Sequence, residues 1–480
     1  MSAQMFYGGD WREARSGATF DATSPATGET IGTLPEGDRE DARAALRAAS
    51  DAAWTWGRQS PFDRATKLHR VADIVESRRA ELVRTCTLDQ GKPLTESSDE
   101  VDELVALLRL SAEDGIRIEG SIGVPAAPSR RALLVRRPRG VVACISPWNW
   151  PYTMPSEIVA PALAAGNAVV WVPAPSTAWC STVLAECFVE ADFPPGVFNL
   201  VLGPGPVVGD EIVANPLSQA VAFIGSTATG LRVSARAAGK AQLLEMGGNG
   251  PLVVLADADL DAAVEATLMG AFLCAGQSCT AAEQILVAGE VREAYVEKLR
   301  VATEEQIRLG DPFEESTTMG PLNNEPVAAK MDAHVADALH RGATLIAGGK
   351  RARGFPTDLY WQATILDDVP RDADVANEET FGPIAPVVEI DGLEDAVART
   401  NASAYGLATA IFTRDLSAGL AYAERVRVGS VTINETTNYW ESQLPAGGAA
   451  GTASGTGRVG GRHTVEFFTE LQNISLPLPG

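Results

Sequence analysis

Apolar residues recur with helical spacing in three segments of the first quarter of the chain. Asp38 precedes an alanine-rich stretch over residues 42–53, and Ser60-Pro61 precedes a stretch with apolar residues at 68, 71, 74 and 75. A third stretch has apolar residues at 101, 104, 105 and 108 and ends before Gly115. Helical periodicity behind a capping residue or a first-turn Pro predicts three amphipathic packing helices. The first 35 residues are rich in turn formers, which predicts an extended arm with strands.

Short apolar runs separated by helix-length stretches replace this pattern after residue 140. One set of runs covers residues 140–145, 168–172, 197–202, 220–224 and 242–246. A second set covers residues 251–256, 285–288, 343–347, 363–368, 385–390, 408–412 and 430–434. The alternation predicts parallel strands with crossover helices, and therefore an α/β fold with two α/β domains and a cleft between them.

The loops that follow the strands are the expected ligand sites, because open parallel sheets bind ligands beyond the carboxyl ends of their strands. In the first set these loops are SPWNWPY (146–152), PAPST (173–177), GSTATG (225–230) and EMGGNG (245–250). In the second set, GQSCTAAEQ (276–284) lies between an apolar, helix-like run and a strand-like run. Cys279 is therefore expected on a constrained turn, where a nucleophilic thiol can be presented.

Composition narrows the classes of function. The chain has 480 residues, which predicts two or three domains, and a formal net charge of −23, which argues against nucleic acid or an anionic membrane as a partner. This acidic chain has one arginine cluster, which consists of Arg130, Arg131, Arg136, Arg137 and Arg139. The cluster is either one exposed strand face or a binding patch.

The six cysteines are scattered and few, which predicts a reduced, cytoplasmic protein without a metal site. No signal-peptide core or membrane-spanning run is visible in the sequence. The glycine-rich segment after Pro445 has two readings, a flexible lid or a backbone that a ligand approaches closely.

Two further residues carry candidate chemistry. Asn149 lies in a turn rich in Pro and Trp, where its amide would be held rigidly as an oxyanion donor, although a turn-forming Asn is the ordinary interpretation. Glu245 ends an apolar run without a basic neighbour, so burial would raise its pKa toward that of a general base; a solvated carboxylate is the alternative.

Five ordered motifs resemble those of the NAD(P)-dependent aldehyde dehydrogenase superfamily. ISPWNWP (145–151) resembles the oxyanion-Asn segment, FIGSTATG (223–230) the cofactor turn, and LLEMGG (243–248) the general-base motif. GQSC (276–279) resembles the nucleophile motif, and EETFGP (378–383) the nicotinamide-ribose motif. LGDP with MGPL (309–322) and SGTGR (454–458) also fit. The resemblance covers nearly the whole chain and implies a Rossmann-type cofactor domain, an α/β catalytic domain and a small β oligomerisation extension.

The resemblance also implies the roles of individual residues. Cys279 would attack the aldehyde to give a thiohemiacetal, with Asn149 and the Cys279 backbone N–H stabilising the oxyanion. Hydride transfer to NAD, or alternatively NADP, would leave a thioester that water activated by Glu245 hydrolyses. The implied cofactor contacts are Ile145, Ser146, Trp148, Val172, Pro175, Gly225, Ser226, Gly230, Met246, Gly247, Glu379 and Phe381.

Several positions depart from the pattern of the superfamily. Val172 and Pro175 replace a Lys and a Glu that hold the adenosine ribose, which leaves the choice between NAD and NADP open. Gln284 replaces an Arg, and the glycine-rich C-terminal motif lacks its usual Lys, is two residues longer and has Ala446 where an aromatic residue is common. Glu157 lies where many relatives have an aromatic residue or Arg. It would favour a cationic or amino-bearing aldehyde, unless it faces solvent or pairs with an Arg.

The expected substrate tunnel is rich in aromatic residues, which suggests an aromatic or medium-chain aldehyde; its candidate residues are Trp150, Tyr152, Met154, Glu157, Ser278, Thr280, Tyr439 and Trp440. Two other functions stay open at this point, a CoA-acylating semialdehyde dehydrogenase and a structural or cofactor-binding member of the superfamily. Glu245 argues against the first, and the altered ribose segment gives some support to the second.

The resemblance divides the chain into three parts. Residues 1–118 and 140–246 would form the cofactor-binding domain, and residues 247–445 the catalytic domain. Residues 119–139 and 446–480 would form an oligomerisation ribbon and a C-terminal tail, with a last strand near residues 464–477. Strand addition through these segments would build a homodimer or homotetramer. The arginine cluster would then face a partner subunit.

Overall fold

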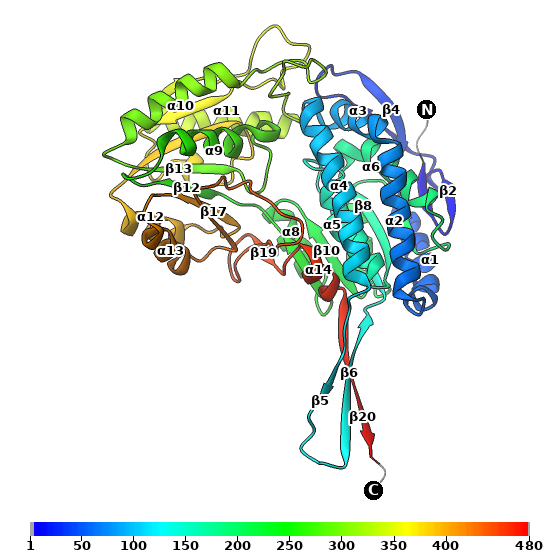
Figure 1. The fold of residues 1–480 in the computed structure, drawn as a ribbon. Helices are drawn as coiled ribbons and strands as arrows, with labels where there is room; N and C mark the ends of the chain where they lie inside the picture. Colours follow the sequence, from blue (N-terminus) through cyan, green and yellow to red (C-terminus); the bar gives the residue numbers. More distant parts are fainter. Residues whose placement is uncertain (1–3, 479–480) are drawn as a thin grey trace.

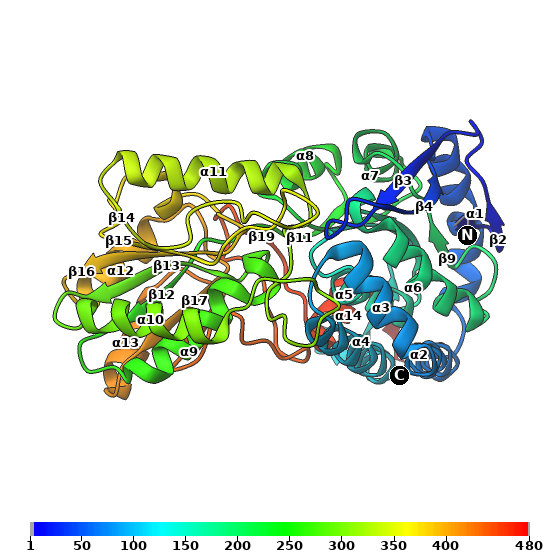
Figure 2. The ribbon, with the colours of Figure 1, turned by 90° about the horizontal axis from the view of Figure 1, so that it is seen from above.

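Two open sheets side by side form the body of the protein in a computed structural model that describes residues 4–478 (Figures 1 and 2). The eight-stranded sheet has the strand order β19-β11-β10-β7-β8-β9-β1-β2. Its parallel centre contains β7 (Val141–Ser146), β8 (Ala168–Pro173), β9 (Phe198–Leu200), β10 (Ala220–Ile224) and β11 (Ala241–Glu245). The first set of apolar runs therefore forms one parallel sheet, as predicted.

The second sheet has seven strands in the order β14-β15-β16-β13-β12-β17-β18. Its strands are β12 (Gly250–Val254), β13 (Ala282–Ala288), β14 (Thr344–Ala347), β15 (Thr364–Asp367), β16 (Ile384–Ile390), β17 (Ala408–Phe412) and β18 (Ser430–Ile433). All pairs are parallel except β14 with β15, which is antiparallel. The prediction that the second set of runs forms parallel strands was thus wrong for the edge strand β14, because an apolar run does not reveal strand direction.

Helices cover both sheets. The protein therefore has the mixed α/β architecture that the sequence predicts. The first sheet is packed by α1 (Arg39–Gly57), α2 (Pro61–Ser77), α3 (Arg79–Gln90), α4 (Leu94–Gly115), α5 (Thr153–Ala164), α6 (Ala178–Glu190), α7 (Asp210–Ala214) and α8 (Thr227–Arg236). The second is packed by α9 (Leu260–Phe272), α10 (Arg292–Gln306), α11 (Glu325–His340), α12 (Leu393–Ala402) and α13 (Leu416–Arg425). Within residues 4–478, no helix combines the length and the apolar character that crossing a membrane requires.

The predicted helix starts have a visible physical basis. The Asp38 carboxylate accepts the backbone N–H groups of Glu40 and Asp41 and so caps α1, and Pro61 occupies the first turn of α2. The sequence analysis missed α3, which buries polar Thr87, Asp89 and Gln90 beside its few apolar residues and therefore lacks a clear apolar stripe.

The two ends of the chain differ in part from the expectation. The predicted arm forms strands, but β1 (Met5–Tyr7) and β2 (Asp10–Arg12) join the edge of the first sheet, while β3 (Thr19–Thr23) pairs with β4 (Thr30–Pro35). The final strand was expected from residue 464, yet α14 (Gly461–Phe467) precedes β20 (Thr469–Pro477). The glycine-rich segment contributes β19 (Gly455–Thr456), which pairs with β11.

A three-stranded ribbon projects from the body (Figure 1). It contains β5 (Ser121–Gly123), β6 (Arg130–Pro138) and β20, and β6 pairs with β20 over nine residues. Two members of the arginine cluster bind within their own chain: Arg136 donates to Thr469 Oγ1 at 3.0 Å and Arg137 to Gln472 Oε1 at 3.1 Å. These arginines brace the ribbon itself.

A fully buried ion pair supports the loop that follows β7. Lys92 Nζ lies 2.7 Å from Glu100 Oε2, and both side chains have no exposed surface. The other oxygen of Glu100 accepts the backbone N–H groups of Tyr152 and Thr153 at 2.8 and 3.3 Å. The Lys92 ammonium also lies 3.5 Å from the centre of the Trp150 ring. The start of α5 is therefore fixed against α4 by a charged, fully hydrogen-bonded contact.

Candidate active site

The Cys279 turn begins with a short left-handed segment after α9. Cys274 and Ala275 have φ values of 52° and 53°, and Gly276 has 72°. Two consecutive non-glycine residues in this region store strain, which persists only where surrounding contacts fix the backbone. A Cβ atom at position 276 would collide with the Gly382 carbonyl group, so glycine is required there for space as well as for φ.

Buried hydrogen bonds hold this segment in place. The Glu96 carboxylate accepts the Cys274 backbone N–H at 3.1 Å. The Gln277 side chain donates to the Cys274 carbonyl at 2.8 Å and accepts the Asn323 N–H at 2.9 Å. Asn149 Nδ2 donates to the Gln277 carbonyl at 3.0 Å. The Asn149 amide is therefore buried and directed at the turn that carries the thiol.

The Cys279 thiol and the Glu245 carboxylate, at the end of β11, line the same cavities. Burial raises the pKa of Glu245 to about 8, against a smaller opposing effect of the thiol. Burial, reinforced by Glu245 and Glu379, raises the pKa of the Cys279 thiol well above its ordinary value. The resting thiol is therefore protonated at neutral pH, and it shares its cavities with a carboxylate whose pKa suits general-base work near neutrality.

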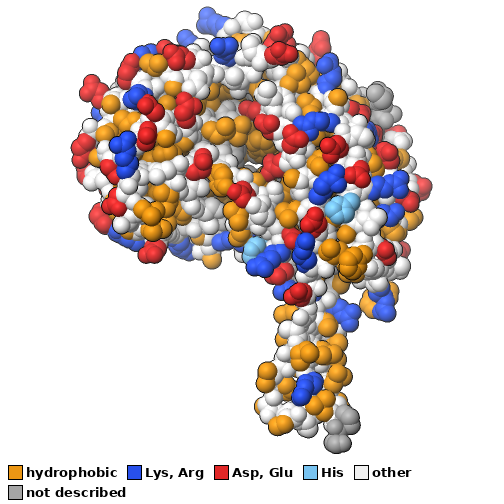
Figure 3. All heavy atoms as spheres, viewed as in Figure 1, with side chains coloured by type: hydrophobic (Ala, Val, Ile, Leu, Met, Phe, Trp, Pro, Cys, Tyr) orange, Lys and Arg blue, Asp and Glu red, His pale blue; other side chains and the backbone are white. Residues whose placement is uncertain are grey.

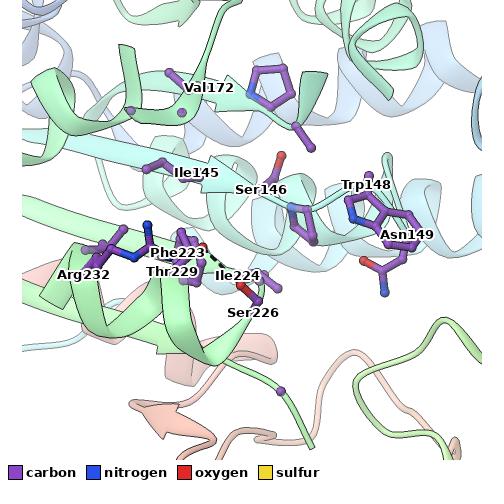
Figure 4. Close-up of a pocket in the computed structure, with 18 of the residues that line it drawn as sticks. Ile145, Ser146, Trp148, Asn149, Val172, Phe223, Ile224, Ser226, Thr229 and Arg232 are labelled. Atoms are coloured by element: carbon purple, nitrogen blue, oxygen red, sulfur yellow. Dashed lines mark hydrogen bonds between the residues drawn. The ribbon is translucent and has the colours of Figure 1, made fainter. Parts of the chain in front are cut away.

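A cleft of about 900 Å³ extends from this pair across the carboxyl ends of β7, β8 and β10. Figure 4 shows Ile145 and Val172 on adjacent strands, with Ser226, Thr229 and Arg232 on the helix below. Most of the predicted cofactor residues line it, namely Ile145, Ser146, Trp148, Val172, Pro175, Gly225, Ser226, Gly247, Glu379 and Phe381. Gly230 and Met246 lie behind the wall, where a Cβ at Gly230 would collide with the Met246 sulfur. They allow α8 to approach β11 closely.

The cleft fits a dinucleotide. The Ser226 side chain makes no capping bond to α8 and instead donates to Thr229 Oγ1 at 3.1 Å, which leaves the first N–H groups of the helix free for a pyrophosphate. Trp148 and Phe381 form an edge-to-face pair with ring centres 5.4 Å apart. These features match the size, the anionic centre and the aromatic ring of NAD(P).

Glu283 and Gln284 follow the nucleophile motif and shape the far wall of the cleft. The sequence analysis did not single out Glu283. Glu283 accepts the backbone N–H groups of Thr380 and Phe381 at 2.7 and 2.5 Å, and so orients the turn that carries Glu379. Burial and the neighbouring Glu379 raise the pKa of Glu283. Gln284, which replaces the Arg of the pattern, donates to Asn249, and Asn249 donates to the Glu378 carbonyl at 2.6 Å.

A second chamber of about 170 Å³ meets the cleft at the thiol. Cys279, Glu245 and Met154 line both spaces, so the thiol lies where they join. Six other predicted substrate residues line the chamber as well: Trp150, Glu157, Ser278, Thr280, Tyr439 and Trp440. Tyr152 does not, because its buried hydroxyl donates to the Leu82 carbonyl at 3.0 Å.

The chamber contains two polar residues that the sequence analysis missed. Asn438 Oδ1 accepts hydrogen bonds from Ser278 Oγ at 3.0 Å and Thr280 Oγ1 at 2.7 Å, which fixes both side chains that flank Cys279. Glu103 reaches the chamber from α4, and burial raises its pKa to about 7. Its spacing from Glu100, three residues along one helix, was the available signal in the sequence.

Known proteins resemble the chain over its whole length. The profile of the aldehyde dehydrogenase family matches residues 11–474. Succinate-semialdehyde dehydrogenase [NADP(+)] of Escherichia coli is 37% identical over 478 residues, which cover 99% of this chain and 98% of the relative. Glutarate-semialdehyde dehydrogenase of Pseudomonas aeruginosa is 37% identical over 98% of this chain and 97% of its own length. Betaine aldehyde dehydrogenase of Staphylococcus aureus, solved in complex with NAD+, is 32% identical and superposes with a TM-score of 0.95, covering 98% of this chain and 94% of that one.

Gly276→Ala tests whether the left-handed turn positions the thiol. We expect it to lower the melting temperature and to slow alkylation of Cys279 by iodoacetamide at least tenfold, because a Cβ there must displace the Gly382 backbone. Gly239→Ala is the matched control, since Gly239 also has a positive φ, of 84°, but has open space around its Cβ position. Equal effects of the two variants on the alkylation rate would show that the collision does not matter.

Proposed function

Because the chain belongs to the aldehyde dehydrogenase family, and so oxidises an aldehyde to a carboxylic acid with NAD or NADP, we propose that Cys279, Glu245 and Asn149 perform the chemistry. The observation that supports this assignment is that Cys279 and Glu245 line both cavities and so meet at their junction. A substrate carbonyl in the smaller chamber and a cofactor in the cleft would meet at this thiol.

The first half of the reaction is the addition of the thiol to the aldehyde. The Cys279 thiol gives up its proton to solvent, and Cys279 Sγ bonds to the carbonyl carbon while the C=O π electrons move to the oxygen. The Asn149 Nδ2–H and the Cys279 backbone N–H stabilise the resulting oxyanion. NAD(P) held by the residues of the larger cleft would supply the hydride acceptor for the carbon attached to Cys279, which would then remain bound to the sulfur as a thioester.

The second half is hydrolysis of that thioester. Glu245 removes a proton from water, the water oxygen bonds to the acyl carbon, and the C–S bond breaks to release the acid and the Cys279 thiolate. The free acid is thus the product, as in the hydrolytic members of the family, and the CoA-acylating alternative from the sequence analysis is set aside. The catalytically inert alternative is also set aside, because the named relatives are enzymes.

We also propose that Arg232 allows the enzyme to use NADP. Val172 and Pro175 place no charge near the adenosine ribose. Arg232 lies at the end of the cleft opposite Asn149 (Figure 4). Arg232 donates to the Ala228 carbonyl at 3.3 Å, whereas the neighbouring Arg236 is paired with Asp210 at 2.6 Å. A guanidinium in this position suits a 2′-phosphate.

Assembly and location are part of the proposal. We propose a homo-oligomer, a homodimer or homotetramer, that uses the projecting ribbon as its contact. Ile122 and Leu471 on the ribbon are 70% and 61% exposed, and Figure 3 shows hydrophobic side chains gathered along it. We further propose a cytoplasmic location, since all six cysteines are free.

Glu245→Gln tests the two-step mechanism. We expect a pre-steady-state burst of reduced nicotinamide followed by a steady-state rate at least about 100-fold below that of the wild type, because water activation is lost. In the wild type, deacylation should rise as pH increases through about 8, where Glu245 loses its proton, and this rise should disappear in the variant. Cys279→Ala is the control that should give neither burst nor turnover. Absence of a burst in Glu245→Gln would contradict the assigned role.

Arg232→Ala tests the cofactor proposal. We expect the KM for NADP to rise about tenfold or more, as for loss of one charge-assisted contact, while the KM for NAD changes much less. Arg232→Lys should restore part of the difference, because it keeps a cation in the same place. Equal changes in the two KM values would refute a contact with the 2′-phosphate.

Leu471→Asp tests the ribbon contact. Light scattering coupled to size-exclusion chromatography should show a smaller assembly, because a buried, unpaired carboxylate opposes association. The control is Leu416→Asp, since Leu416 is 66% exposed on α13, away from the ribbon. An unchanged mass for Leu471→Asp would place the contact elsewhere. Charge reversal at Arg136 or Arg137 would be a poorer test, because it would disturb hydrogen bonds inside the ribbon.

A further inference from the structure

The smaller chamber has an unusual charge. The described residues that line it include three carboxylic acids, Glu103, Glu157 and Glu245. None of these lining residues is Lys, Arg or His. Lys92 lies on the Trp150 ring, and its charge is offset by Glu100 at 2.7 Å. The chamber thus has an excess of negative charge whenever its carboxyl groups ionise.

Glu157 is the most deeply buried member of this group. It comes from the first turns of α5, is only 2% exposed, and lines the chamber. Its Oε1 atom is buried and has no hydrogen-bond partner within the described residues. The sequence analysis left two other possibilities for Glu157, that it faces solvent or pairs with an Arg, and neither agrees with this environment. A buried carboxylate oxygen without a donor is costly, and a ligand that supplies a donor removes the cost.

Other orphan polar atoms lie around the same chamber. Thr153 Oγ1, Thr437 Oγ1 and Trp440 Nε1 are also buried without hydrogen-bond partners, and all three residues line it. Unpaired polar atoms gathered around one cavity indicate a polar ligand that completes them. The space of about 170 Å³ suits a short chain, since a liquid water molecule takes about 30 Å³.

We propose that the substrate is a short aldehyde that carries a protonated amine at its far end, which Glu157 binds. This inference rests on the proposed function, because it places the aldehyde carbon at Cys279 and the ammonium group at Glu157. The ammonium N–H donates to the Glu157 carboxylate, and Trp150, Tyr439 and Trp440, which also line the chamber, provide an aromatic surface around it. Such a cation favours the ionised form of Glu157, whose pKa burial and the nearby Glu103 and Glu245 otherwise raise.

The negative charge of the chamber disfavours the substrates after which two of the relatives are named. Succinate semialdehyde and glutarate semialdehyde end in a carboxylate, and a carboxylate in this chamber would face Glu157 and Glu103 without a described cation beside it. Sequence identity of 37% with those enzymes is therefore compatible with a substrate of opposite charge.

Three aldehydes of similar size separate the possibilities. 3-Aminopropanal and butanal have the same number of heavy atoms and differ in an ammonium group against a methyl group, while succinate semialdehyde carries a carboxylate. We expect kcat/KM for 3-aminopropanal to exceed that for butanal by about 10- to 100-fold, as one charged hydrogen bond in a buried site allows, and succinate semialdehyde to be the poorest substrate. A higher kcat/KM for succinate semialdehyde or butanal than for 3-aminopropanal would overturn the inference.

Glu157→Gln tests the assigned residue. The ratio of kcat/KM for 3-aminopropanal to that for butanal should fall about tenfold or more, mainly through KM, because the amide keeps the shape but loses the charge. Glu113→Gln on the exposed face of α4 makes the same charge change and should leave the ratio unaltered. An unchanged ratio in Glu157→Gln would overturn the role of Glu157.

The melting temperature of Glu157→Gln shows whether this variant folds. If it does not fold, the comparison of the three aldehydes with the wild-type enzyme still tests the inference. Failure of the proposed function is distinguishable from failure of this inference. If none of the three aldehydes reduces NAD or NADP, the oxidation itself is not supported. If butanal or succinate semialdehyde is oxidised best, the oxidation stands and the amine specificity is wrong.

Discussion

Desolvation of carboxyl groups controls the chemistry of the region between the two sheets. Glu157, Glu245 and Glu283 are buried there and Glu103 and Glu379 are half-buried, and desolvation is the largest cause of the raised pKa of each. Only the ionised carboxyl forms are strongly penalised by burial, so these groups retain protons at a pH where exposed carboxyl groups have lost them. The protein thereby obtains a proton acceptor with a pKa near neutrality at the thiol without a histidine.

The strained turn at Cys274 and Ala275 depends on contacts from distant segments. Glu96 on α4, Asn323 before α11 and Gly382 after the Glu379 turn all fix its backbone. Each of these segments also bears on the cofactor or substrate side of the site. The position of the thiol is therefore set by the packing of both sheets together, and the strain is held by the whole fold rather than by local preference.

Much of this arrangement could be predicted from the sequence, for identifiable reasons. Buried parallel strands appear as continuous apolar runs, so β7, β8, β10 and β12 were visible. Ordered motifs brought Asn149, Glu245 and Cys279 together. The direction of β14 was not readable, and α14 was taken for a strand because β-branched and aromatic residues fill it, whereas its contacts with α4 and α5 favour a helix. Glu103 and Asn438 were missed because their partners are distant in the chain, at Glu157 and at Ser278.

One stretch, residues 145–157, serves every part of the reaction. Its beginning contacts the cofactor cleft, Asn149 reaches the nucleophile turn, and its end supplies Trp150, Met154 and Glu157 to the smaller chamber. Glu100 ties the middle of the stretch to α4. Evolution can therefore exchange residues in this stretch one at a time and so alter substrate choice alone. An insertion or deletion would shift the cofactor contacts, the oxyanion donor and the substrate contacts together, so divergence of specificity within this architecture must proceed here at constant length.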